Sequence, residues 1–303
     1  MKNLRGIDIL FAIALALVFA LTGCKKNATD PIVEANTTED AAESVANSLG
    51  EDNGGVADQI GDIADLSGSL GIQPEAAVLA EKYGLSTAAG DTVYKSYDAG
   101  TQTWTLFISR SRVNFLGLYR SGFTRTYSYQ FINKDNVPQQ FYRTGTDTAY
   151  TIKFKVTDGS GYAFTRRLNH RLLSLTSDWV VTGANTSTVT INGTSKRIGA
   201  DTLTTHNFVR SLNHTLDLTF TNVTGPRAPR AGSGIGFTRN PRMTGGTITG
   251  TYTASVGVLR GDAYTERNFT KTFTVTFDGS GGNINMNGRI FRVDLLYGEL
   301  TGG

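Results

Sequence analysis

From residue 91 onward, apolar and polar side chains alternate repeatedly, and this period of two constrains the fold more than any other feature of the sequence. The clearest runs are 150–156, 216–220 and 273–277, where Thr, Lys or Asp separates aromatic and aliphatic residues. Strict alternation is typical of antiparallel strands with one buried and one solvated face. The enrichment in Thr, Val, Tyr and Phe favours the same structure.

Turn signals separate the alternating runs. Asn192-Gly193 and Asn287-Gly288 are dipeptides favoured in two-residue hairpin turns, because both central residues need a positive φ. The sequences TDGSGYAF and FDGSGGNI indicate slightly longer hairpin loops. We therefore predict a mainly β fold over 91–303, an antiparallel meander that forms a sandwich, a half-barrel or a small barrel.

The preceding segment, 37–84, has a helical period instead and completes the predicted fold as a short acidic α-helical region. A capping-box pattern over 36–39 and Gly50 bound a first helix. Pro74 and Gly84 bracket a third, short helix. The second helix is predicted from an apolar stripe formed by Val56, Ile60, Ile63 and Leu66.

The charge distribution divides the chain at the same place. Residues 27–81 hold twelve acids and no base, whereas residues 82–303 hold 25 bases and 13 acids. Short acidic helices are marginal in water, so we expect them to pack on the basic region, as a docking surface or as a mask over a ligand site. The alternative is a flexible acidic stalk.

The N-terminus predicts a membrane address. Lys2 and Arg5 precede an apolar run of 13 residues, 9–21, which is too short to span a bilayer because a helix needs about 20 apolar residues for that. A run of this length is typical of a signal peptide. The tetrapeptide Leu21-Thr22-Gly23-Cys24 then resembles the bacterial lipobox.

That resemblance implies a signal peptide over 1–23, diacylglyceryl transfer to the Cys24 thiol, cleavage before Cys24 and acylation of the new amino group. The tether would be 24–36, and the lipid would make the membrane the first partner. Lys25 stands where some lipoproteins carry an aspartate for inner-membrane retention, so we expect the outer membrane. An uncleaved transmembrane anchor and a chance match are the alternatives.

Motifs for catalysis or metal binding are not visible in the sequence. It has no HExxH or GxSxG pattern, and its one cysteine is the predicted lipid attachment site. We expect His170, His206 and His214 to be polar residues on a solvated face. We therefore predict no catalytic residue, no metal site and no cofactor.

One segment, 225–242, suggests a ligand site. It carries three prolines, no acid and four arginines, whose planar forks suit carboxylate and phosphate groups. We predict either an anion-contacting loop or a solvated loop. Nucleic acid suits the charge but not the expected compartment. The candidate anion-binding residues are Arg227, Arg230, Arg239 and Arg242.

Together these features predict a lipid-anchored cell-envelope protein with a non-catalytic binding or structural role. Its Arg-rich β domain would contact an anionic or amphipathic envelope component, or an envelope protein. One alternative is an envelope hydrolase or carbohydrate-active enzyme. Another is an accessory subunit that docks on an envelope complex.

Overall fold

The structure is a computed structural model, and it describes residues 31–68, 92–113, 120–164, 168–204, 209–227, 243–260 and 263–301. The chain divides into two compact units, Met1–Thr37 and Thr38–Gly303. The first unit contributes only the start of α2 (Pro31–Leu49) to the described residues. All that follows concerns the second unit.

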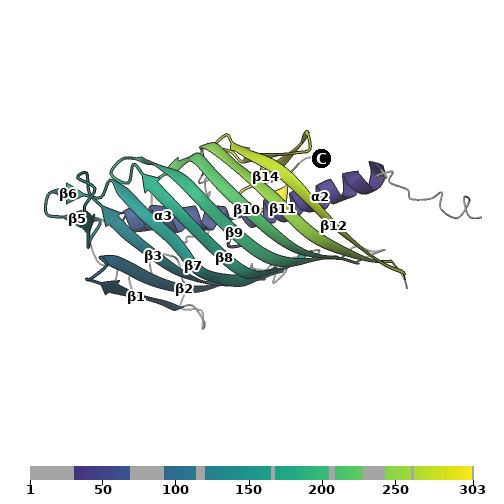
Figure 1. The fold of residues 1–303 in the computed structure, drawn as a ribbon, viewed down its shortest axis with the longest axis horizontal. Helices are drawn as coiled ribbons and strands as arrows, with labels where there is room; N and C mark the ends of the chain where they lie inside the picture. Colours follow the sequence, from purple (N-terminus) through teal and green to yellow (C-terminus); the bar gives the residue numbers. More distant parts are fainter. Residues whose placement is uncertain are drawn as a thin grey trace, which may run out of the picture. The chain divides into compact units, whose positions relative to one another are not determined.

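One antiparallel sheet of 13 strands dominates this unit (Figure 1). Neighbours in the sheet are neighbours in the chain, apart from β4, which pairs with β3, and the separate β5–β6 ladder. Among the described strands β1 and β15 end the order, so the sheet is open. The strands are β1 (Thr92–Asp98), β2 (Thr103–Val113), β3 (Arg120–Ile132), β4 (Pro138–Gln139), β5 (Arg143–Thr144), β6 (Asp147–Thr148), β7 (Thr151–Phe164), β8 (Leu168–Thr182), β9 (Thr188–Thr204), β10 (Val209–Pro226), β11 (Gly245–Arg260), β12 (Ala263–Phe277), β13 (Gly282–Met286), β14 (Arg289–Asp294) and β15 (Glu299–Leu300).

The predicted alternation sets the two faces of the sheet. Its apolar phase is buried on β7, β10 and β12, and the residues between are exposed or half-buried. Trp179 on β8 is the largest fully buried side chain. The prediction of a mainly β antiparallel meander preceded by a short acidic helical region is confirmed.

The helices lie on the inner face of the sheet, within its hydrophobic core. Val45 and Leu49 of α2, and Ile60 and Ile63 of α3 (Val56–Gly68), are at most 1% exposed and belong to the same cluster as the inward side chains of the strands. Between residues 38 and 64 only Glu39 and Glu43 are exposed. A helix buried on nearly every side lies inside a core, so the acidic segment is part of the domain and not a stalk.

The helix boundaries are partly as expected. Helix α3 begins at Val56 and α2 ends before Gly50, as predicted. The capping box over 36–39 is wrong, because α2 begins at Pro31, inside the segment expected to be a tether. Proline is favourable at a first helical position, where its missing N–H costs no hydrogen bond.

Of the two Asn-Gly dipeptides predicted to form turns, only one does. Asn287 and Gly288, with φ of 53° and 78°, form the predicted turn between β13 and β14. Asn192 and Gly193 lie inside β9, so the second predicted turn is wrong. A Cβ on Gly193 would lie 2.1 Å from the Asp178 carbonyl oxygen, so this glycine allows a close approach of β8.

A bulge in β10 explains why Asn192 lies inside a strand. The register of β9 and β10 shifts between Phe220 and Val223, and Asn192 Oδ1 accepts a hydrogen bond of 2.8 Å from the Asn222 backbone N–H there. Of the two longer predicted loops, FDGSGGNI joins β12 to β13 as expected. TDGSGYAF lies inside β7 and is no turn.

The connection between the helices is attached to the C-terminal part of the sheet. The backbone N–H groups of Glu51 and Asp52 donate to the carbonyls of Leu295 and Leu296, each at 2.8 Å. Asn53 Nδ2 donates to the Tyr297 carbonyl at 2.8 Å. These bonds attach the connection between α2 and α3 to residues 295–297, which are distant in sequence.

Among the described residues, no helix is both long and apolar enough to cross a membrane. The predicted signal peptide over 1–23, Cys24 and the third helix over 74–84 lie outside the described residues.

Candidate functional site

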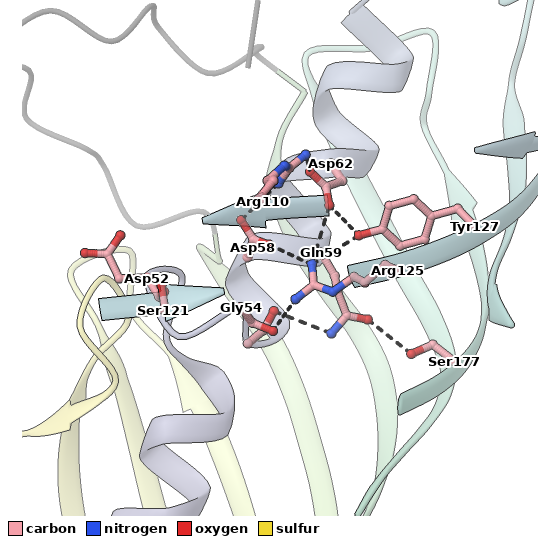
Figure 2. Close-up of polar contacts among 11 residues, drawn as sticks. Asp52, Gly54, Asp58, Gln59, Asp62, Arg110, Ser121, Arg125, Tyr127 and Ser177 are labelled. Carbon is pink, nitrogen blue, oxygen red and sulfur yellow. Dashed lines mark hydrogen bonds and ion pairs between the residues drawn. The ribbon is translucent and has the colours of Figure 1, made fainter. Parts of the chain in front are cut away.

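The inner face carries a buried ionic network between α3 and the first strands, here called the α3 network (Figure 2). It consists of Asp58, Asp62, Arg110, Arg125 and Tyr127. Arg110 Nη2 donates to Asp62 at 2.6 Å, and Arg125 Nη1 donates to Asp58 at 2.6 Å. The side chains of both aspartates are fully buried, so the network is shielded from water.

Each charge in the α3 network has an opposite charge or a polar partner beside it. Tyr127 Oη donates to Asp62 at 2.5 Å, and Arg125 Nη2 donates to the Gly54 carbonyl. Burial lowers the pKa of Arg125, but Tyr127, Asp58 and Asp62 outweigh it, so that this pKa is raised. Burial also raises the pKa of Tyr127. The guanidinium and the phenol therefore keep their protons at every physiological pH.

A second buried group, here called the Asp201 cluster, consists of Ser44, His170, Arg197, Asp201 and His214. Asp201 Oδ1 lies 2.5 Å from His170 Nδ1, and Asp201 Oδ2 accepts a hydrogen bond of 2.6 Å from Ser44 Oγ on α2. His214 Nδ1 lies 3.5 Å from Asp201 Oδ2. The expectation of solvated histidines is wrong for His170 and His214, which are 1% and 3% exposed.

The two histidines are buried because they lie in the inward phase of their strands. His170 pairs with Asp201 across β8 and β9, and His214 pairs with Gly199 across β9 and β10. A Cβ on Gly199 would lie 2.8 Å from His214 Nε2, so the glycine makes room for the ring. Burial lowers the pKa of His214 to about 4, so the ring is neutral at pH 7.

The Asp201 cluster contains Ser, His and Asp, but not in the order that activates a nucleophile. A nucleophilic serine needs the imidazole as its base. Here Ser44 Oγ donates to the carboxylate instead, and all of these side chains are buried. Among the described residues no group of three or more His, Cys, Asp or Glu side chains could hold a metal ion.

Arg197 differs from the other buried arginines. It is 1% exposed, and none of Nε, Nη1 and Nη2 has a hydrogen-bond partner within the described part of the chain. Burial, and the positive charge of Arg125, lower its pKa to about 9 despite the attraction of Asp201. The guanidinium is therefore still charged at pH 7 but is not hydrogen-bonded.

The opposite, outward face of the sheet is hollowed into an open groove of about 1050 Å³. Eight threonines line it, together with two asparagines. Its four charges form cross-strand pairs, Lys155 with Asp178 at 2.8 Å and Lys196 with Asp217 at 3.5 Å. One continuous row crosses β9 to β12 and consists of Thr194, Thr219, Thr249 and Thr274.

Of the predicted anion-binding residues, only Arg227 lies in the described part. Its Nη1 donates to Tyr142 Oη at 2.9 Å, and its Nε donates to the Thr186 carbonyl. The guanidinium thus binds groups of its own domain. Arg230, Arg239 and Arg242 lie outside the described residues.

The buried arginines were not among the residues predicted from the sequence. One signal was available, because Arg110 continues the inward phase of Leu106 and Ile108, and Arg125 lies between Phe123 and Tyr127 in the same phase. A charged residue in the buried phase of a strand requires a buried partner. The acidic helices are the segment that could supply it.

Comparison with protein families, with curated proteins and with solved structures finds no match to this chain. The site therefore has to be interpreted from its own geometry.

Proposed function

We propose that the protein is a lipid-anchored cell-envelope protein with a non-catalytic binding role, and that the outward groove binds a polar, uncharged envelope polymer such as a glycan strand. The observation that carries this proposal is the composition of the groove, which is dominated by hydroxyl and amide side chains. The lipobox-like sequence ending at Cys24 supports the envelope location.

The chemistry of the groove suits a neutral ligand. Threonine and asparagine side chains donate and accept hydrogen bonds, as sugar hydroxyls do. The two lysines and two aspartates of the groove neutralise one another as cross-strand pairs. Neighbouring strands lie about 4.8 Å apart, so the threonine row offers regularly spaced hydroxyls to an extended polymer.

The inner face is less suitable for a polymer, because the helices of the chain itself fill it. Arg110 and Arg125, which could attract an anionic component, are buried against Asp58 and Asp62. Arg110 and Arg125 therefore give little support to an anionic polymer as the ligand. Asp58 and Asp62 are enclosed, so this pair does not offer the accessible acid and base of a glycosidase.

The binding proposal is tested with the full-length protein and purified envelope polysaccharide. We expect Thr219→Val and Thr249→Val each to weaken binding by about fivefold, because one hydrogen bond contributes about 1 kcal/mol. Isothermal titration calorimetry measures the affinity. Thr253→Val, on the same face of β11 but outside the groove, is the matched control.

Salt dependence separates this proposal from the anionic one. Affinity for a neutral glycan should change little between low and high salt, whereas affinity for an anion should fall steeply. If the double variant Thr219→Val/Thr249→Val bound the polysaccharide with wild-type affinity, the proposal that the groove is the binding site would be contradicted. The anchor is tested separately by mass spectrometry, where an unmodified Cys24 thiol or an intact leader would contradict it.

A further inference from the structure

We infer that the inner face of the sheet contains an enclosed binding site for a small monovalent anion, a halide such as chloride, held by Arg197. The inference rests on a buried guanidinium whose three nitrogens all lack a partner among the residues that the structure describes, beside other polar atoms in the same condition. It concerns a site separate from the outward groove.

The buried guanidinium of Arg197 requires a hydrogen-bond acceptor. Guanidinium carries five N–H donors and no acceptor. Buried polar groups in folded proteins almost always have a partner, and an unmatched buried charge is very costly. A partner for Arg197 therefore has to come from a bound species.

Asp201 does not supply that partner. Its two oxygens are engaged by His170 and by Ser44, at 2.5 and 2.6 Å. It attracts Arg197 only through space. The carboxylate thus lowers the energy of the buried cation without satisfying its donors.

The positive charge near Arg197 favours an anion over water alone. Arg125, whose charge is close enough to act on Arg197, has an unpartnered Nε of its own. Two guanidinium groups that repel each other gain from a negative charge beside them, whereas a water molecule brings none. The unpartnered N–H groups of Arg197 and Arg125 are best met by a ligand that only accepts hydrogen bonds.

The surroundings limit the size of that anion. On β9, Arg197 is flanked by Leu175 of β8 and Leu216 of β10. All three side chains are at most 5% exposed, so the site is enclosed. A halide accepts hydrogen bonds from any direction and is small, which suits a guanidinium whose nitrogens make no hydrogen bond within the described residues. A larger polyvalent anion would need more desolvated cations than this region holds.

The test is a thermal-unfolding series on the full-length protein in sodium chloride and in sodium gluconate at equal ionic strength. Chloride should raise Tm saturably, by about 3–6 °C at a concentration about ten times its Kd. Arg197→Met should abolish the difference between the two salts. Lys196→Met, which removes a neighbouring outward lysine, should keep it.

Two results would overturn the inference. One is equal Tm values in chloride and gluconate for the wild-type protein, which would leave ordered water as the partner of Arg197. The other is an undiminished chloride effect in Arg197→Met. Crystals grown in bromide give a readout that needs no variant, because a bound halide would produce an anomalous peak beside Arg197 and water would not.

Discussion

The α3 network and the Asp201 cluster lie on the same inner face, but their buried arginines differ in whether they are hydrogen-bonded to a carboxylate. In the α3 network, Arg110 and Arg125 meet two aspartates through direct, short hydrogen bonds. In the Asp201 cluster the carboxylate binds His170 and Ser44, and Arg197 has no hydrogen-bond partner in the described part of the chain. Each group holds as many aspartates as arginines, so the difference lies in hydrogen bonding.

This comparison shows that charge balance alone does not make a buried group stable. Removing one partner of a bonded pair leaves an uncompensated charge, whereas removing an unbonded charge relieves a cost that the fold already carries. Substitution of arginine should therefore have opposite effects at the two places. The next three predictions use this difference, in order of decreasing effect.

The largest effect is expected for Arg125→Met. It leaves Asp58 buried without its 2.6 Å partner and should lower the free energy of unfolding by about 3–5 kcal/mol. Urea unfolding followed by tryptophan fluorescence measures it. The double variant Asp58→Leu/Arg125→Met should recover part of the loss, since it removes both charges. The pairing would be contradicted if the double variant lost more free energy of unfolding than Asp58→Leu and Arg125→Met lose in total.

A smaller effect is expected from pH, through His214. Its pKa is lowered to about 4 in the folded protein, while an unfolded histidine has about 6.5. The unfolded state thus binds more protons between pH 6.5 and 4, so stability should fall as pH decreases through this window, by up to about 3 kcal/mol. Urea unfolding at pH 7, 5.5 and 4.5 checks this. His214→Phe should flatten the profile, and an unchanged slope would count against His214.

The smallest effect, and the one of opposite sign, is expected for Arg197→Met. In chloride-free buffer it should raise the free energy of unfolding by about 2 kcal/mol, because it removes a buried charge that makes no hydrogen bond. Urea unfolding next to Lys196→Met, an exposed change expected to be near neutral, measures it. A loss of stability as large as that of Arg125→Met would show that Arg197 has a protein partner after all.

The sequence was sufficient for the fold class, because alternation is a local pattern. Ile152, Phe154 and Val156 are inward as predicted, and so are the corresponding residues of β10 and β12. The α3 stripe is buried for the same reason. Tyr150, placed in the same phase, precedes β7 and is 44% exposed.

Local pattern was not sufficient where tertiary contacts decide. Asn192-Gly193 and Asn287-Gly288 have the same local preference, but only the second is a turn. The first meets a bulge in β10, and nothing near residue 192 encodes that bulge. The pairing of His170 with Asp201 likewise depends on the register of two long strands, so the sequence predicted neither histidine as buried.

The bonds that hold the helix connection to residues 295–297 have a consequence for how the protein is made. The helices leave the ribosome long before the segment whose carbonyls bind Glu51 and Asp52. Contacts so far apart in sequence close slowly, because a long loop has to be ordered before they form. The core is therefore incomplete until residues 295–297 have been synthesised, and until then the apolar side chains of α2 and α3 lack part of their packing.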